Sequence, residues 1–177
     1  MIWNKGQITF PETTRYYQCF EYMFVFTKGK IKTHNQISDR KNKCYGQLMH
    51  GTDRQKDGTM TEKSAIKLKN QRKVKEFGVR YNIWNISPAT QNRTGHPAVF
   101  PEQLAEDHII SWSNENDIVM DIFSGSGTTH KMALKNHRKF IGFEISQEYV
   151  DIEEQRIKDC DLWCYDENYK IIKNREE

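Results

Sequence analysis

The chain has 177 residues and a formal net charge of +3, and its 21 aromatic residues favour a folded domain over a disordered chain. The longest unbroken apolar run, Tyr22 to Phe26, is far shorter than the ~18 residues that a membrane span needs, and no secretory signal opens the sequence. These features argue against a membrane-spanning or secreted protein and predict a soluble protein of the cytoplasm.

The N-terminal half joins an apolar segment to a strongly basic one. Residues 17–28 are rich in aromatic and β-branched side chains, which predicts a buried strand. Residues 28–80 contain fifteen basic and five acidic residues, so this stretch carries a charge of +10, and it is poor in large aliphatic side chains. It forms either a solvated insertion or a surface that faces nucleic-acid phosphates.

The second half alternates predicted helices and strands. A short strand over residues 81–86 is followed by a polar loop, and Pro101 begins a helix with one apolar face. Strands over residues 118–123 and 140–143 are separated by a helix over 128–136, and another helix begins near Gln147. This alternation is typical of an α/β fold with a parallel sheet.

The four cysteines indicate neither a disulfide framework nor a metal site. Cys19 and Cys44 are isolated, whereas Cys160 and Cys164 are spaced by about one helical turn. A metal site would need two further ligands. We therefore expect packed thiols on an apolar helix face and no bound metal.

The sharpest functional signal is the loop between the strand over 118–123 and the next helix, Asp121-Ile122-Phe123-Ser124-Gly125-Ser126-Gly127-Thr128-Thr129. Its two glycines allow a tight turn and let a ligand approach bare backbone beside a helix N-terminus. A dinucleotide fingerprint is excluded because His130 stands where a third glycine or alanine is needed, and a phosphate-binding loop is excluded because no Gly-Lys-Ser/Thr follows.

Glu144 indicates which class of ligand this loop binds. It ends the strand over 140–143, nineteen residues after Gly125. In nucleoside-binding α/β folds, a carboxylate about 20 residues after the glycine loop, at the end of the second strand, holds ribose hydroxyls. The loop and Glu144 together therefore predict a nucleoside site.

These residues resemble the amino-directed DNA methyltransferases that use S-adenosylmethionine. The family's cofactor loop is matched by Asp121, Phe123, Gly125, Gly127 and Thr128, and its ribose carboxylate by Glu144. His96 and Pro97, in a string that ends at Pro101, resemble the element that holds the methionine end of the cofactor. The resemblance implies a Rossmann-like sheet that binds S-adenosylmethionine and an enzyme that methylates adenine N6 or cytosine N4.

A cofactor loop that follows a basic segment is similar to the beta class of this family. That resemblance assigns residues 1–29 to late strands of the catalytic half and 30–80 to a basic, irregular target-recognition insertion. It assigns 81–160 to the cofactor-binding part and leaves 161–177 as a polar tail. In the insertion, the basic residues expected to contact double-stranded DNA are Lys67, Lys69, Arg72, Lys73 and Lys75.

One departure from the family concerns catalysis. The beta class carries an (Asp/Ser/Asn)-Pro-Pro-aromatic motif ahead of the recognition region, but the four prolines of this chain, at positions 11, 88, 97 and 101, are never adjacent. The sequence therefore predicts no catalytic residue, an incomplete sheet and an N-terminally truncated methyltransferase that is inactive alone. Two alternatives stay open: a non-catalytic DNA- or cofactor-binding fragment that partners a separately encoded N-terminal half, and a remnant without function.

Overall fold

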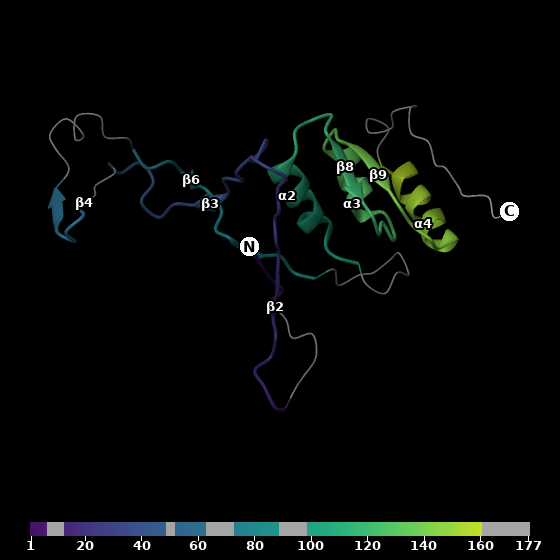
Figure 1. Cartoon of the computed structure of the whole chain (residues 1–177), viewed down its shortest axis with the longest axis horizontal. Helices are drawn as coiled ribbons and strands as arrows, with labels where there is room; N and C mark the ends of the chain where they lie inside the picture. Colours follow the sequence, from purple (N-terminus) through teal and green to yellow (C-terminus); the bar gives the residue numbers. More distant parts are fainter. Residues whose placement is uncertain (7–12, 49–51, 63–72, 89–98, 161–177) are drawn as a thin grey trace. The chain divides into compact units, whose positions relative to one another are not determined.

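Figure 1 shows the computed structural model of the chain, which describes residues 1–6, 13–48, 52–62, 73–88 and 99–160. The chain divides into two compact units, one made of Met1–Asn35 and Asn82–Glu177 and the other of Gln36–Tyr81. Within the described residues, no helix is both long enough and apolar enough to cross a bilayer.

The first unit contains a strand–helix–strand element that carries the glycine loop. Strand β8 (Ile118–Asp121) runs parallel to β9 (Lys139–Gly142), and α3 (Thr128–Lys135) connects them. Helix α2 (Glu102–Trp112) precedes β8, and α4 (Gln147–Lys158) follows β9. In space, α3 contacts α2, α4 and both strands (Figure 1). The predicted alternation is confirmed, although β8 ends two residues earlier than expected. Helix α4 ends before Cys160, which therefore lies beyond the helical face predicted for it.

A small core joins α2 and α3 to one face of this sheet. Ala105 and Ile109, one turn apart on α2, pack on Met132 and Ala133 of α3, and the strands add Val119 and Phe140. Strand side chains alternate between faces, so Ile118, Met120 and Ile141 project elsewhere and are exposed. One face of the two-stranded sheet is thus covered by helices, and the described residues leave the other face open.

A second core lies against α2. Strand β1 (Ile2–Asn4) pairs antiparallel with β2 (Phe20–Tyr22) and parallel with β7 (Ile83–Asn85), in the order β2-β1-β7. Trp3 and Trp84 are buried with Leu104 of α2. The indole N–H of Trp3 donates to the carbonyl of Ile86 at 2.7 Å, which satisfies its polar atom inside the core.

The buried strand predicted over residues 17–28 is wrong in length and in burial. Only β2 is a strand, it lies at the edge of its sheet, and Tyr22, Phe24 and Phe26 are exposed by 64%, 74% and 88%. Their rings contact one another along the chain, with centroids 6.0 and 6.3 Å apart. An alternating aromatic pattern reports strand propensity, but burial requires a layer that covers the rings, and the described residues supply none.

In its described residues, the second unit contains two short antiparallel strand pairs. Strand β3 (Arg40–Lys41) pairs antiparallel with β6 (Phe77–Gly78), and β4 (Thr52–Arg54) pairs antiparallel with β5 (Met60–Glu62). Among the described residues of this unit, no side chain is buried. This agrees with the scarcity of aliphatic residues, because a segment that cannot bury apolar surface forms only short, open elements.

Candidate functional site

The glycine loop connects the end of β8 to the start of α3 through two backbone conformations that favour glycine. Gly125 has φ of +52° and Gly127 has φ of +74°, both in the left-handed region. The N–H of Gly127 donates to the carbonyl of Ser124 at 2.8 Å, which closes a tight turn. The N–H of Ser124 donates to Phe143 at 3.0 Å and ties the loop to the segment after β9.

Asp121 stabilises the loop through two hydrogen bonds. Its Oδ1 accepts a hydrogen bond from the N–H of Phe123 at 3.0 Å, and its Oδ2 accepts one from the hydroxyl of Thr129 at 2.6 Å. One carboxylate therefore connects the first residues of the loop to the first turn of α3. A negative side chain at this helix start is also favoured by the helix dipole.

Glu144 meets the loop directly. Its Oε2 accepts a hydrogen bond from the N–H of Gly125 at 2.9 Å, and its Oε1 accepts from the N–H groups of Ile145 and Ser146, both at 2.9 Å. The structure thus brings together the two residues that the sequence places nineteen positions apart. Oε1 already accepts two hydrogen bonds and Oε2 accepts one, so the remaining lone pair of Oε2 can accept a hydrogen bond from a ligand hydroxyl group.

Apolar surface borders this carboxylate. The ring of Phe123 is 81% exposed, and Ile145, next to Glu144, is 97% exposed. The sequence singled out Phe123 but not Ile145, whose only signal was an apolar residue between two polar ones. Two exposed apolar groups beside a hydroxyl-accepting carboxylate fit a ligand that has both a flat ring and a sugar.

Thr128 follows the loop as the first residue of α3. Its side chain is buried, and its hydroxyl accepts a hydrogen bond from Nη1 of Arg156 at 3.1 Å. The hydroxyl of Thr128 is therefore engaged with α4, and its backbone N–H belongs to the first turn of α3, where N–H groups have no partner within their own helix. Arg156 comes from α4, and the sequence analysis missed it.

Two further polar residues pack beneath the loop. The carboxylate of Glu153, also on α4, accepts a hydrogen bond from the hydroxyl of Ser124 at 2.9 Å and contacts Nδ1 of His130. His130 is 1% exposed and stacks on Phe140 with ring centroids 4.5 Å apart. The sequence used His130 only to exclude a dinucleotide fingerprint, whereas the structure places it in the core under the loop.

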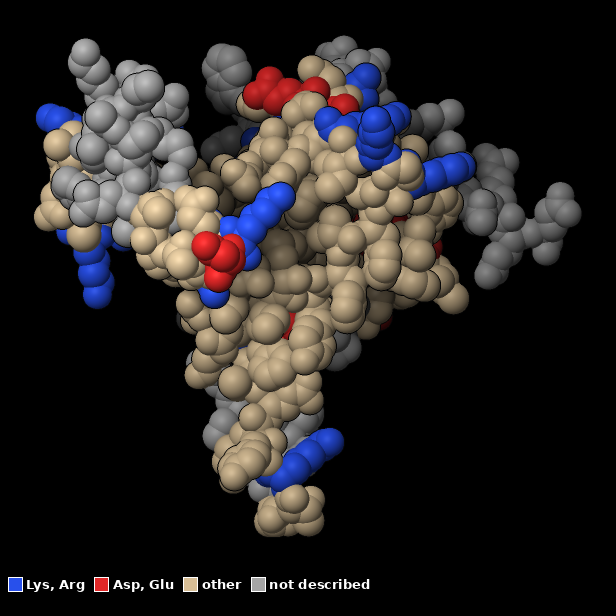
Figure 2. Space-filling model, turned by 60° about the vertical axis from the view of Figure 1, so that its left-hand side comes forward, with Lys and Arg blue, Asp and Glu red and all other residues tan. Residues whose placement is uncertain are grey.

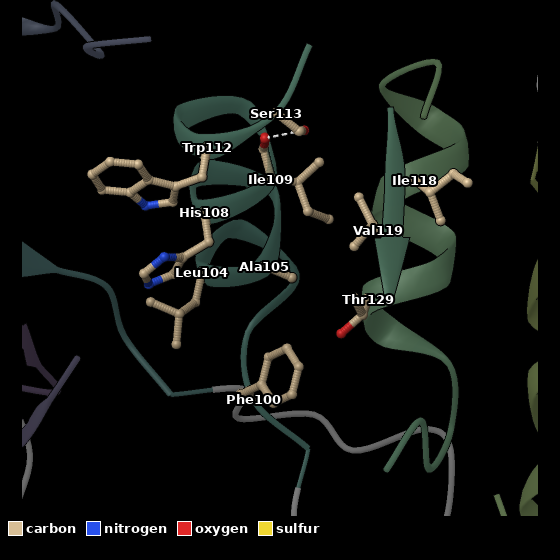
Figure 3. A pocket seen from close by; sticks show the side chains of 10 residues that line it. All are labelled: Phe100, Leu104, Ala105, His108, Ile109, Trp112, Ser113, Ile118, Val119 and Thr129. Carbon is tan, nitrogen blue, oxygen red and sulfur yellow. Dashed lines mark hydrogen bonds between the residues drawn. The ribbon is translucent and has the colours of Figure 1, made fainter. Parts of the chain in front are cut away.

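A pocket of about 460 Å³ lies between α2 and β8 (Figure 3). Its walls are the apolar faces of α2 and β8, with Phe100 and Thr129 at one end. Burial lowers the pKa of His108 in this pocket below its ordinary value, although the charge of Asp107 opposes the shift, so the ring is neutral at pH 7. Among the described strands, β8 pairs only with β9, so its other edge is open.

The remaining predicted residues divide between described and undescribed parts. His96, Pro97, Lys67, Lys69 and Arg72 lie outside the described residues, as does Cys164. Lys73 and Lys75 are described and exposed, at the start of the segment that leads to β6. The contacts assigned to all of these residues stay predictions.

Comparison with known proteins identifies a group of relatives. Residues 1–155 match a family described as DNA methylase, of the N6/N4 type. The orphan methyltransferase M.BamHII of Bacillus amyloliquefaciens is 52% identical over 185 aligned positions, which cover all of this chain and 64% of the relative. The DNA adenine methyltransferase YhdJ of Escherichia coli is 34% identical over 97 residues, 53% of this chain and 33% of YhdJ.

Solved structures of similar proteins cover smaller parts of the chain. The complex of M1.HpyAVI with SAM has 37% identity and a TM-score of 0.40 over 42% of this chain and 37% of its own. The cytosine-N4-specific PvuII DNA methyltransferase has 32% identity and a TM-score of 0.42 over 52% of this chain and 34% of its own. The chain thus spans less than two thirds of the length of each of these relatives.

Proposed function

Because the chain belongs to the N6/N4 DNA methylase family, we propose that it is the cofactor- and DNA-binding part of an S-adenosylmethionine-dependent methyltransferase that acts on an amino group of adenine or cytosine. The observation that supports this most directly is the hydrogen bond from Gly125 to Glu144, which joins the ends of two parallel strands. Ligands of open α/β sheets bind at such ends.

The residues around this bond fit the proposed cofactor. Glu144 would accept a hydrogen bond from a ribose hydroxyl through Oε2, and Phe123 offers an exposed ring to the adenine. Gly125 leaves the backbone open to the ligand, while Asp121, Gly127 and Thr128 hold the loop in shape. We assign His96 and Pro97 to the methionine end. When bound, S-adenosylmethionine supplies a methyl group activated by its sulfonium charge.

Glu144 provides the first test of this assignment. Glu144→Ala is expected to weaken S-adenosylmethionine binding by at least about tenfold, because one hydrogen bond to a charged group contributes about 1.5–3 kcal/mol. Isothermal titration calorimetry would compare this variant with the wild type and with Glu148→Ala, which removes an exposed carboxylate from the start of α4. Equal affinity of all three proteins would contradict the site.

The absence of adjacent prolines bears on the chemistry itself. Without the Pro-Pro motif, nothing in this sequence is assigned to accept the target amino group or to stack on a flipped base. The chain would then bind and orient the cofactor, and the reacting amino group would need acceptors from elsewhere.

The pocket beside β8 favours one alternative role, that of partner to a separately encoded polypeptide. The pocket is apolar, no described strand pairs with the neighbouring edge of β8, and M.BamHII is longer than its match to this chain. An open strand edge beside an apolar surface is a site at which another chain can add a strand. The partner would contribute the missing acceptor groups.

We expect the isolated chain to transfer no labelled methyl group to unmethylated double-stranded DNA. Adding a polypeptide that carries the part of M.BamHII unmatched by this chain is expected to restore transfer. Transfer by the chain alone, abolished by Gly125→Val, would show that its catalytic groups had been overlooked. The matched control is the M.BamHII polypeptide by itself.

The second unit supports the DNA-binding part of the proposal. Its described lysines are all exposed: Lys41, Lys43, Lys56, Lys73 and Lys75. Arg80 instead donates to Asp39 at 2.9 Å, and this hydrogen bond lowers the pKa of the carboxyl group below its ordinary value. Lys and Arg side chains stand out from the surface of the molecule (Figure 2). Exposed ammonium groups on short strand pairs and the segments that connect them fit phosphate contacts that do not depend on sequence.

Salt dependence distinguishes phosphate contacts from a merely solvated segment. The logarithm of the DNA affinity should fall with the logarithm of salt concentration, with a slope of about −0.9 per phosphate neutralised. We expect charge reversal at five basic residues of this segment to make the negative slope shallower by several units. This basic cluster comprises Lys67, Lys69, Arg72, Lys73 and Lys75.

Lys135→Glu and Lys158→Glu serve as controls, because both side chains are 57% exposed and lie in the first unit. If these controls flatten the slope as much as reversal of the cluster does, the attraction to DNA is diffuse and residues 30–80 are not a recognition region. If neither set changes the slope, the basic segment is a solvated insertion.

A further inference from the structure

Two side chains of α4, three residues apart, form hydrogen bonds with the glycine loop. Glu153 is 7% exposed and the side chain of Arg156 is 15% exposed. Residues three apart on a helix project from the same face, and here that face is turned toward the loop and the start of α3.

Arg156 controls the peptide group between Ser126 and Gly127. Its Nη1 donates to the carbonyl of Ser126 at 2.6 Å and contacts the hydroxyls of Ser126 and Thr128 at 3.0 and 3.1 Å. In a trans peptide the C=O and N–H groups point in opposite directions, so holding this carbonyl on α4 directs the N–H of Gly127 back into the loop. There it closes the turn on Ser124.

A counter-charge keeps the guanidinium in place. Glu102 accepts from Nη2 of Arg156 at 2.9 Å and from Nζ of Lys131 at 2.7 Å through the same oxygen. Burial alone would raise the pKa of Glu102, but the hydrogen bonds and charges of Lys131 and Arg156 outweigh burial and hold the pKa below its ordinary value. Glu102 is therefore ionised at neutral pH, and the planar guanidinium bridges α2, the loop and α4.

Glu153 fills the space that Gly127 leaves open. A Cβ atom at position 127 would lie 2.5 Å from Cγ of Glu153, so even alanine at this position would displace the carboxylate. The same carboxylate takes the hydroxyl hydrogen bond of Ser124 and contacts His130, which compensates its burial. The second glycine of the motif therefore makes room for a supporting side chain on α4.

We propose that Glu153 and Arg156 are positioning residues that hold the glycine loop in the conformation in which Gly125 meets Glu144. Their polar contacts are made with loop hydroxyls, with a loop carbonyl, with the first turn of α3 and with Glu102 of α2. Neither side chain belongs to the two apolar clusters of the unit, so we expect their removal to act mainly on the Ser126–Gly127 peptide group of the loop. The inference rests on the proposed function only for the identity of the ligand.

Arg156→Met tests the inference against a matched control. Arg138 is also a half-buried arginine that donates to backbone carbonyls, those of Ser113 and Asn136, away from the loop. We expect Arg156→Met to weaken S-adenosylmethionine binding at least about tenfold in calorimetry, and Arg138→Met to change it less than about twofold. Arg156→Lys should recover part of the loss, because an ammonium group can reach one acceptor but cannot form the fork.

Amide hydrogen exchange of the ligand-free chain gives a second readout. Exchange of the Gly127 N–H should accelerate at least about tenfold in Arg156→Met and in Ser124→Ala, which removes the hydroxyl partner of Glu153, and should not change in Arg138→Met. Unchanged exchange in Arg156→Met and Ser124→Ala would overturn the inference. If the wild type binds no S-adenosylmethionine, the proposed function fails, while the exchange rates still decide the role of α4.

Discussion

A chain carrying Gly125→Val is expected to bind S-adenosylmethionine at least about a hundredfold more weakly than the wild type, an effect equivalent to about 2.7 kcal/mol. Gly125 has φ of +52°, a conformation in which a β-branched residue is strongly disfavoured. Its N–H donates to Glu144, so a change of backbone conformation there also separates the loop from the proposed ribose carboxylate. Calorimetry at saturating ligand would measure the loss.

Two variants separate backbone strain from obstruction of the site. Gly125→Asn introduces a side chain but tolerates the left-handed conformation, so weak binding by this variant would point to obstruction. Gly58→Val creates similar strain at φ of +87° in the turn between β4 and β5, where an added Cβ meets nothing within 4 Å. If Gly58→Val impairs binding as much as Gly125→Val, the effect is general destabilisation and the loop is not the site.

Gly142→Ala is expected to destabilise the first unit by about 1–3 kcal/mol, through overpacking. A Cβ atom on Gly142 would overlap the ring of His130, which is buried, stacked on Phe140 and held by Glu153. Because one face of the ring stacks on Phe140 and its Nδ1 edge contacts Glu153, the ring cannot move aside without losing one of these contacts. Urea denaturation followed by circular dichroism would give the free energy of unfolding.

Gly78→Ala is the matched control for this substitution. Its Cβ would also come close to a side chain, at 2.5 Å, but the atom it meets is the end of the flexible Arg40. We expect a change below about 1 kcal/mol, since a terminal guanidinium can shift. The double variant His130→Ala/Gly142→Ala should be more stable than the sum of the single effects predicts, by about 0.5–3 kcal/mol. Additive effects would mean that the two residues do not clash.

The relation between sequence and structure differs from one part of the site to another. The loop and Glu144 were predictable because both follow parallel strands, and the carboxyl ends of neighbouring parallel strands meet at one edge of the sheet. The exposure of residues 17–28 was not predictable, because strand propensity is a local property, whereas burial depends on a second layer that covers the side chains.

The sequence pattern was therefore sufficient for the α/β alternation, the turn at Gly125 and the position of Glu144, since turn geometry is local and neighbouring parallel strands end at the same edge of a sheet. The roles of Glu153, Arg156 and His130 emerged only when the helices packed. Opposite charges three residues apart on a helix are typical of a solvated surface, and a histidine inside a helix carries no signal of burial. Their function depends on which face of α4 turns toward the loop, and contacts between residues about 30 positions apart set that orientation.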